Sequence, residues 1–329
     1  MKVLVIGGAG YIGSHAVCEL LKSNNEVVIM DNLSTGRESS INNKAKFYLG
    51  DITQKDDLIK VFREECSIKP FDVVMHFAAK LLVNESVEHP LEYYHNNVEG
   101  VRLMLETMTE FGIKNIVFSS TAAVYGNPTK EECSEDDTLL PVNPYGETKL
   151  TCEKMIKWVS NTYGINYGIF RYFNVAGADE SLEIGYNYER KIITHLIPIV
   201  AEVALGIREK LMVYGDDYET KDGTCIRDYV HVSDLANAHV LGANYLLTEN
   251  KSFIINLGSN DGYSVKEIIE AAEKIYPIKY EMSNRREGDP AKLIASNKKA
   301  KELLGWSQKL DLFDIINSDI KYRKRLVKK

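Results

Sequence analysis

Cysteine is scarce in this sequence, long apolar runs are missing, and there is no excess of basic residues. The 329 residues include 5 scattered cysteines without a C-x-x-C pair, so a disulfide scaffold is excluded and free thiols in a reducing cytoplasm are expected. No apolar run approaches the roughly 18 residues of a membrane span, and Met1 leads straight into an apolar segment without room for a leader. The 40 basic and 47 acidic residues give a net charge of −7, which argues against nucleic-acid binding. We therefore expect a cytoplasmic protein with no membrane or nucleic-acid partner and no metal.

Hydrophobic residues alternate between two spacings along the first half of the chain. Short β-branched runs are separated by longer segments of helical spacing. Continuous apolar strands between helices indicate a parallel sheet that is covered on both faces. Right-handed crossovers then predict an α/β fold with a doubly wound parallel sheet. The expected strands are residues 3–6, 27–30, 47–49, 73–77, 116–118 and 167–170, and the expected helices include 12–21, 57–62, 98–109 and 148–162.

This alternation weakens after residue 171, which indicates a second, smaller domain. Residues 215–223 are polar and turn-rich, and helical spacing returns at 264–275 and 297–304. We predict a first domain from residues 1–171 and about 222–252. The α+β second domain would comprise about 172–221 and 253–329.

A glycine-rich turn, from Gly7 to Gly13, follows the first expected strand and opens the first helix. Gly7 allows the tight turn, Gly10 lets the backbone approach a pyrophosphate at the helix N-terminus, and Gly13 allows close packing. Asp31 ends the second strand, 18 residues beyond Gly13, where an acid accepts ribose hydroxyls and repels a 2′-phosphate. The turn therefore predicts a dinucleotide site that favours NAD over NADP, the alternative being a surface turn with an unrelated acid.

Tyr145 is the only tyrosine with a lysine four residues on, Lys149, and Pro144 precedes it as the first residue of a helix would. Thr121 ends the fifth strand, at the sheet edge where open α/β sheets bind ligands. A tyrosine base at neutral pH needs its pKa lowered from about 10, which corresponds to roughly 4 kcal/mol. A cation about 5 Å away supplies roughly 3 kcal/mol, so Lys149 is expected to lower this pKa, and the positive nicotinamide of NAD to lower it further. The hydroxyl of Thr121 can bridge Tyr145 and a substrate oxygen. The alternative is a chance surface pair.

The G-x-x-G-x-x-G spacing and the Y-x-x-x-K motif together resemble the extended short-chain dehydrogenase/reductase family, and the resemblance covers nearly the whole chain. It implies a Rossmann-type first domain that binds NAD and a second domain that binds a nucleotide sugar. It also implies that Asp51 and Ile52 lie at the adenine and that Asn97 joins the catalytic set of Thr121, Tyr145 and Lys149. The further residues it implies around NAD are Tyr11, Ile12, Asn32, Phe77, Ala78 and Ala79.

Four stretches, 119–126, 171–178, 222–232 and 285–289, resemble the UDP-sugar 4-epimerases of this family. The resemblance implies that two arginines bind the diphosphate, although pairing with the neighbouring acids Asp228 and Glu287 is the alternative. Lys80 stands one position before the lysine of many relatives, which is Leu81 here, and its role is open. The implied substrate residues are Arg227 and Arg286 at the diphosphate, Asn174 at the phosphates, His195, Leu196 and Tyr214 around the uridine, and Leu293 at the C2 substituent of the sugar.

The activity that the resemblance implies is reversible, redox-neutral epimerisation at C4 of UDP-galactose and UDP-glucose. It would pass through a 4-keto sugar, with the hydride held on tightly bound NAD. Use of N-acetylated sugars stays open, and a homodimer through helices 98–109 and 148–162 is expected. A nucleotide-sugar 4,6-dehydratase, disfavoured by Ala122 and Ala123 where an Asp-Glu pair would stand, a pentose 4-epimerase and a non-catalytic NAD-sensing module are the alternatives.

Overall fold

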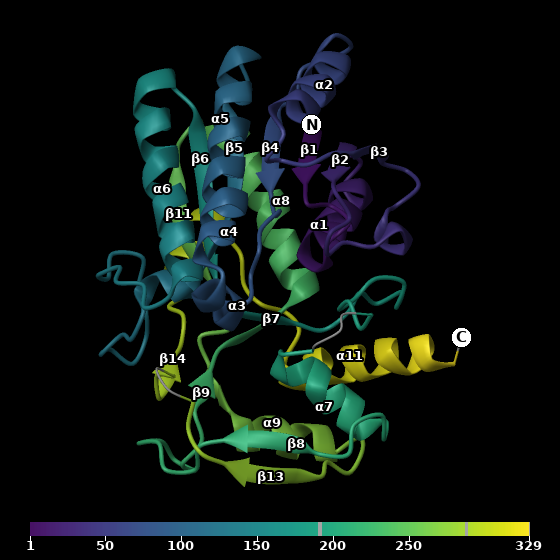
Figure 1. Ribbon diagram of the computed structural model, residues 1–329, viewed down its shortest axis with the longest axis vertical. Coiled ribbons are helices and arrows are strands. Elements are labelled where there is room, and N and C mark those ends of the chain that lie inside the picture. Colours follow the sequence, from purple (N-terminus) through teal and green to yellow (C-terminus); the bar gives the residue numbers. More distant parts are fainter. Residues whose placement is uncertain (190–192, 287–288, 329) are drawn as a thin grey trace. The chain divides into compact units, whose positions relative to one another are not determined.

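The computed structural model describes residues 1–189, 193–286 and 289–328 (Figure 1), and the chain folds into two compact units. The sequence analysis returned the chain to the first domain at about residue 222, whereas in the structure it re-enters the first unit only at Ala236. The reason is that residues 226–231 form strands that pair with other strands of the second unit. The first unit comprises Met1–Gly126, Asp137–Arg171 and Ala236–Ile255, and the second comprises Asn127–Asp136, Tyr172–Leu235 and Asn256–Lys329.

A seven-stranded sheet forms the centre of the first unit, in the order β11-β6-β5-β4-β1-β2-β3. β1 pairs in parallel with β2 and β4, β2 with β3, and β4 with β5. The chain moves outward from β1 in both directions, which is the doubly wound parallel topology that the sequence predicts. Ligands of such sheets bind at the carboxyl ends of the strands, where the order reverses between β1 and β4. The strands are β1 (Lys2–Ile6), β2 (Glu26–Asp31), β3 (Lys46–Leu49), β4 (Val73–His76), β5 (Asn115–Thr121), β6 (Asn166–Tyr172) and β11 (Phe253–Leu257).

Both faces of the sheet are buried, as alternate residues of β1 show. Leu4 and Ile6 lie in a core cluster with apolar residues of α2, α5 and α6. Val3 and Val5 point to the opposite face and are fully buried as well, since α1 packs against β1 and β2. Coverage of both faces is why these strands appear in the sequence as continuous apolar runs.

The helices of the first unit include one irregular turn that the sequence pattern does not predict. The expected helix 98–109 begins as a π-helical turn, η2 (Tyr94–Glu99), before α5 (Gly100–Glu110) continues it. The remaining helices are α1 (Tyr11–Lys22), α2 (Lys55–Cys66), α3 (Val83–Glu88), α4 (Pro90–Tyr93), α6 (Pro144–Tyr163) and, from Ala236 on, α8 (Val232–Glu249), with short 3-10 turns η1 (Glu38–Ser40) and η3 (Ala122–Tyr125).

The second unit contains small sheets and four helices within its described residues. The expected polar turn at 215–223 connects β8 to β9, and the expected helices 264–275 and 297–304 are α9 and α10. β7 pairs with β10, β8 with β13, and β9 lies between β12 and β14. The elements are β7 (Asn174–Ala176), α7 (Leu196–Ala204), β8 (Leu211–Tyr214), β9 (Ile226–Arg227), β10 (Tyr229–His231), β12 (Tyr263–Ser264), α9 (Val265–Glu273), β13 (Tyr280–Ser283), β14 (Lys292–Leu293), α10 (Lys298–Leu304) and α11 (Leu312–Val327).

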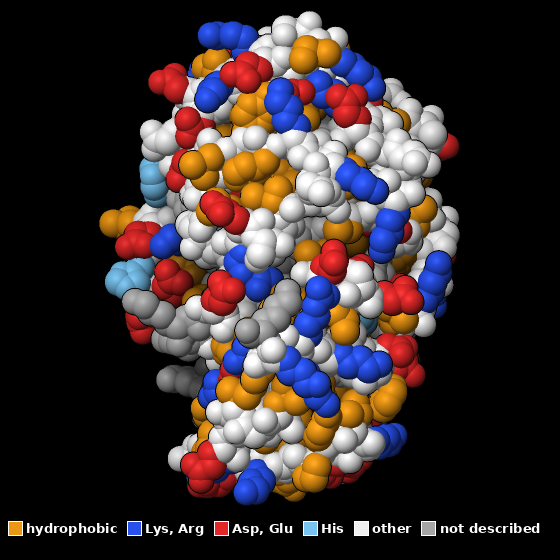
Figure 2. All heavy atoms as spheres, turned by 90° about the vertical axis from the view of Figure 1, so that its right-hand side faces the viewer, with side chains coloured by type: hydrophobic (Ala, Val, Ile, Leu, Met, Phe, Trp, Pro, Cys, Tyr) orange, Lys and Arg blue, Asp and Glu red, His pale blue; other side chains and the backbone are white. Residues whose placement is uncertain are grey.

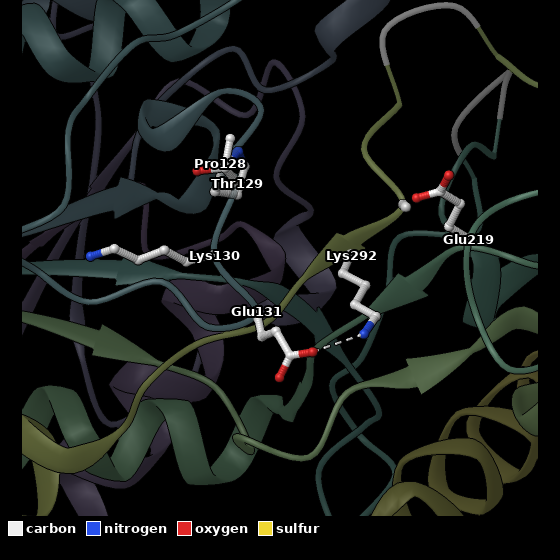
Figure 3. Close-up of a pocket in the computed structure, with 7 residues that line it drawn as sticks. Pro128, Thr129, Lys130, Glu131, Glu219 and Lys292 are labelled. Atoms are coloured by element: carbon white, nitrogen blue, oxygen red, sulfur yellow. Dashed lines mark hydrogen bonds and ion pairs between the residues drawn. The ribbon is translucent and has the colours of Figure 1, made fainter.

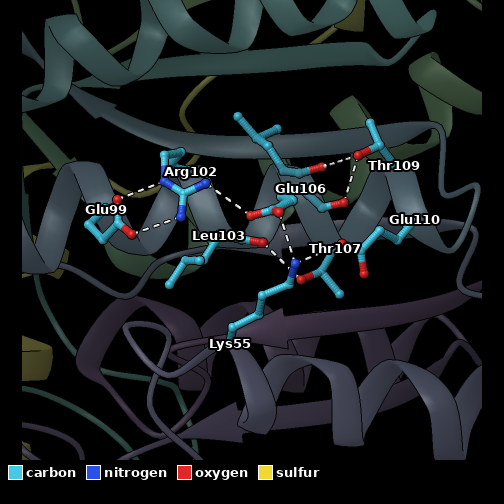
Figure 4. A network of polar contacts seen from close by, with 9 residues as sticks. Lys55, Glu99, Arg102, Leu103, Glu106, Thr107, Thr109 and Glu110 are labelled. Carbon is cyan, nitrogen blue, oxygen red and sulfur yellow. Dashed lines mark hydrogen bonds and ion pairs between the residues drawn. The ribbon is translucent and has the colours of Figure 1, made fainter.

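Surface charges of both signs are mixed on this protein. On the face in Figure 2, lysine and arginine side chains alternate with aspartate and glutamate. An ionic network joins α2 to α5 (Figure 4): Lys55 contacts Glu106 and Glu110 at 2.8 Å each, and Arg102 contacts Glu106 at 2.9 Å. Such exposed pairs contribute little to stability individually. Among the described residues, we find no helix of the length and apolarity that a bilayer crossing requires.

Candidate active site

The glycine-rich turn lies between β1 and α1, at the carboxyl edge of the sheet. Gly7 has φ +83°, and a Cβ on it would lie 2.6 Å from the Ala78 backbone nitrogen. A Cβ on Gly13 would lie 2.1 Å from the Gly7 carbonyl oxygen. Gly10 caps α1 without a side chain, so the helix N-terminus presents backbone alone, as an anion site requires. The turn therefore fits the pyrophosphate of a dinucleotide.

Three predicted cofactor residues contact one another or this turn. The Asp31 carboxylate accepts the backbone N–H groups of Ala9 at 3.0 Å and Leu33 at 2.8 Å, and burial raises its pKa in spite of these bonds. The Asn32 amide donates to Asp51 at 2.9 Å. Burial acts to raise the pKa of Asp51, but hydrogen bonds from Thr53 and Asn32 outweigh it and leave that pKa lowered. Asp31 therefore contacts the glycine turn directly, and Asp51 is linked to Asp31 through its neighbour Asn32.

Asn97 holds the segment that follows β4. Its amide accepts the Lys80 N–H at 2.9 Å and donates to the Lys80 carbonyl at 3.0 Å, and it also donates to the Thr148 hydroxyl of α6 at 3.2 Å. At the start of this segment, the N–H groups of Phe77 and Ala78 donate to the carbonyl that ends β1. The Lys80 ammonium pairs with Glu92 of α4 at 2.5 Å and with Glu85 of α3 at 3.4 Å.

Thr121 and Tyr145 are brought together by the end of β5 and the first turn of α6. The Thr121 side chain accepts the Ala123 N–H at 3.2 Å and hydrogen-bonds to the Tyr145 side chain. Asn143 caps α6 by accepting the Gly146 N–H at 2.9 Å, which fixes the turn that carries Tyr145. The two hydroxyl groups therefore meet at the ligand-binding edge of the sheet.

The pKa of Tyr145 is raised in this structure, whereas the sequence analysis expects Lys149 and NAD together to lower it. Burial raises the pKa of Tyr145, and only the Thr121 hydrogen bond opposes it. Lys149 is 3% exposed; its ammonium donates to the Ser119 carbonyl at 2.9 Å and lies 5.0 Å from the ring centre of Phe118. Burial lowers the pKa of Lys149 to about 8. The lysine therefore remains mostly charged at neutral pH, and the positive nicotinamide of NAD would add to its charge.

In the second unit, β9 and β14 place Arg227 directly beside Leu293. The Arg227 guanidinium donates to the Pro290 carbonyl at 2.8 Å and lies 3.5 Å from the Asp289 carboxylate. It does not pair with Asp228, whose carboxylate accepts the backbone N–H groups of Ala295, which follows β14, and of the loop before β12 instead. The strand pairing therefore positions a mostly buried arginine beside the side chain expected to face the sugar.

Arg286 lies over the ring of Tyr214, with 4.0 Å between its guanidinium carbon and the ring centre. Glu287, its alternative partner, and Gly288 lie outside the described residues. Both Arg227 and Arg286 are close enough to Cys225 to lower its pKa, although burial, the larger effect, raises it. The two predicted diphosphate ligands thus converge on one neighbourhood that also holds the aromatic ring of Tyr214.

The other predicted substrate residues lie on separate elements of this unit. Asn174, on β7, is exposed and hydrogen-bonds to the Tyr229 side chain. His195 caps α7, and its ring nitrogen lies 3.3 Å from the Tyr186 hydroxyl; Leu196 is the first residue of that helix.

A cavity of about 230 Å³ opens beside β14 (Figure 3). Lys292 points into it toward Glu131, at 3.5 Å, and Lys130 and Glu219 also line it. Successive residues of a strand point to opposite sides, so Leu293 faces away from this cavity.

The sequence analysis missed three polar residues that hold the predicted ones. Tyr229, the partner of Asn174, stands in the quoted stretch 222–232, but nothing in the sequence shows the pairing of β7 with β10. Glu153 lies two turns beyond Tyr145 on α6, and that spacing could have revealed it. Arg171, at the end of β6, binds Glu153 and is fully buried.

The fold and this site define a dinucleotide-binding α/β enzyme with a tyrosine–lysine pair at the sheet edge. A model of the NAD-dependent epimerase/dehydratase family matches residues 3–258, and the chain belongs to that family. It is 49% identical over 311 residues to a UDP-glucose 4-epimerase of Halalkalibacterium halodurans, which covers 94% of this chain and 91% of that relative.

Solved structures agree with this assignment. A crystal structure of a UDP-glucose 4-epimerase superposes with a TM-score of 0.94 at 48% identity, covering 99% of this chain and 98% of the other. A UDP-glucose 4-epimerase from Bifidobacterium longum, in complex with NAD+ and UDP, gives a TM-score of 0.92 at 37% identity, covering 99% and 98% of the two chains. The cofactor of this family is NAD, as the glycine turn predicts.

Proposed function

We propose that this protein is an NAD-dependent UDP-glucose 4-epimerase, which interconverts UDP-galactose and UDP-glucose. The observation that carries the proposal is the hydrogen bond between Thr121 and Tyr145, with the Lys149 ammonium one helical turn away on α6. The first unit would bind NAD through the glycine turn, Asp31 and Asp51. The second unit would bind the nucleotide sugar.

In this reaction Tyr145 takes the proton of the sugar 4-hydroxyl, while Thr121 bridges the two oxygens. NAD held by the glycine turn, Asp31 and Asp51 would supply the hydride acceptor and donor for C4, so no external oxidant or reductant would be consumed. Because burial raises the pKa of Tyr145, its phenolate forms readily only beside added positive charge, which couples proton removal to the oxidised cofactor. The proton then returns from Tyr145 to the sugar that has received the hydride on its other face.

Arg227 and Arg286 would hold the UDP diphosphate, for which two guanidinium groups are suited. Binding energy placed on UDP leaves the sugar weakly held, and a 4-keto sugar can then present either face to the hydride. Leu293, beside Arg227, would set the room at the sugar C2 substituent, so acceptance of N-acetylated sugars depends on this position. Ala122 and Ala123 supply no acid or base for a dehydratase.

We also infer a cytoplasmic homodimer that pairs through α5 and α6. The five cysteines are free, as a reducing compartment would leave them. On α6, Trp158 is 74% exposed, and a large exposed aromatic side chain is typical of an interface.

The test of the proposed activity is Tyr145→Phe. The wild type should convert UDP-galactose to UDP-glucose without added cofactor, whereas the variant should lose about 10²- to 10⁴-fold in kcat and still contain NAD. Product is measured by chromatography of the nucleotide sugars, and NAD by its release on denaturation. An NAD-sensing protein would show no turnover in either form, and a variant with wild-type turnover would refute the role of Tyr145.

A further inference from the structure

Tyr145, Lys149 and Glu153 lie four residues apart on α6, so they share one face of the helix. Each contacts one of the last three residues of β5, residues 119–121. The contacts of Tyr145 and Lys149 are described above; the third is a hydrogen bond from the Ser120 hydroxyl to the Glu153 carboxylate, 2.5 Å long. Two of these three contacts serve the reacting groups directly, and the third lies between them on the strand.

Arg171 of β6 completes the arrangement from the other side of Glu153. Its guanidinium donates to both carboxylate oxygens of Glu153, at 2.9 and 2.7 Å, and to the Tyr125 hydroxyl at 3.0 Å. The side chains of Arg171 and Glu153 are 1% and 0% exposed. The bidentate pair therefore ties together α6, β6, the end of β5 and the 3-10 turn η3 that follows β5.

We propose that Glu153 and Arg171 are positioning residues for epimerisation, which hold the end of β5 against α6 so that Thr121 and Lys149 stay aligned with Tyr145. The inference rests on the proposed function. We do not expect either residue to touch the sugar, because both side chains are buried and bind each other and the polar groups of Ser120 and Tyr125. Because Ser119 and Thr121 flank Ser120 on β5, the bond between Ser120 and Glu153 also holds these two residues in place.

The pair also sets the charge around Lys149. Burial lowers the pKa of Lys149, and Cys152 and Glu153 of α6 oppose this. From β4, His76 lies close enough to interact with Lys149, and burial together with that ammonium lowers the pKa of His76 to about 3, so the imidazole stays neutral. Burial raises the pKa of Tyr145, so without the cofactor's charge its phenol is neutral. Loss of the Glu153 charge therefore leaves Arg171 as an uncompensated cation and favours loss of the Lys149 proton.

Glu153→Gln tests the proposal, with kcat and KM for UDP-galactose measured from pH 6 to 10. We expect kcat to fall about 10- to 100-fold, KM to change less than about 3-fold, and the decline of kcat at alkaline pH to begin at lower pH than in the wild type. The matched control is Glu65→Gln, which breaks another buried pair, with Lys2 at 2.8 Å. Lys2 begins β1, at the opposite end of the strand from Gly7, so this control should lower the melting temperature and leave kcat and its pH profile unchanged.

Ser120→Ala removes the hydrogen bond to Glu153 but keeps the Arg171–Glu153 ion pair, so it tests the proposal even if Glu153→Gln does not fold. It should lower kcat by about 3- to 10-fold while the alkaline decline stays at the wild-type pH, because no charge is removed. Wild-type kcat in folded Glu153→Gln or in Ser120→Ala would overturn the proposal, as would an effect on melting temperature alone. A wild type that does not turn over UDP-galactose would instead contradict the proposed function.

Discussion

Tyr145 and Lys149 both stand where burial disfavours the charged form that the reaction uses. Burial raises the pKa of the phenol and lowers that of the ammonium to about 8. The Ser119 carbonyl and the Phe118 ring stabilise the ammonium, so the lysine remains mostly protonated at neutral pH. The Thr121 hydrogen bond stabilises the Tyr145 phenolate, but burial outweighs it. Formation of the phenolate therefore depends on the positive charge of the oxidised cofactor.

The pH dependence of turnover should reveal the deprotonation of Lys149. Lys149 is active as the cation, and its proton is lost as the pH rises through about 8, so kcat should decline above that pH. Lys149→Arg keeps its charge to far higher pH; its kcat should be about 10-fold or more below wild type, without the alkaline decline. Steady-state kcat from pH 6 to 10 measures both, and an unchanged decline in the arginine variant would assign it to another group.

Among the elements, the turn between β1 and α1 packs closely against its neighbours. Gly7 needs a positive φ and also lacks room for a Cβ against the backbone after β4. The turn and the Phe77–Ala79 segment are therefore fitted to each other, so a change in one shifts the other.

Gly7→Ala should disturb both segments. The strained φ and the backbone clash should reduce the free energy of unfolding by at least about 2 kcal/mol, and the purified protein should contain much less NAD. Gly112→Ala is the control, because Gly112 has φ +69° but nothing within 4 Å of an added Cβ. It should cost about 1 kcal/mol and keep its NAD; denaturant unfolding and NAD content distinguish the two. Equal NAD loss in both variants would contradict this account of the turn.

The order of the first six strands of the first unit and of most helices between them was predictable because both signals are local: apolar runs for strands buried on two faces, and helical spacing between them. The edge strand β11 was not predicted, because residues 253–257 were assigned to the second domain. That Tyr145, Lys149 and Thr121 lie together at the end of β5 was predictable from a motif and a strand end; their catalytic roles stay a prediction. The return of the chain at Ala236 was not predictable, because it depends on the pairing of β9 and β10 with strands far along the sequence. The raised pKa of Tyr145 was also not predictable. The i, i+4 spacing places Lys149 near Tyr145 but does not show that its ammonium binds the Ser119 carbonyl.

At the scale of the whole molecule, the exposed aromatic side chain on α6 predicts self-association. Sedimentation should give about twice the chain mass of 37.2 kDa. Trp158→Glu places a charge at the centre of the inferred interface and should yield the monomer, whereas Ile68→Glu, at a residue 76% exposed on the loop after α2, should not. A monomeric wild type, or a dimeric Trp158→Glu, would remove this interface.

The central claim is that the hydride leaves C4 and returns to C4 within one protein molecule. UDP-galactose labelled with deuterium at C4 tests it most directly, in ordinary water and without added cofactor. We predict UDP-glucose that retains the deuterium at C4, as seen by NMR or mass spectrometry. Deuterium lost to the solvent, or turnover that requires an external reductant in each cycle, would contradict the account.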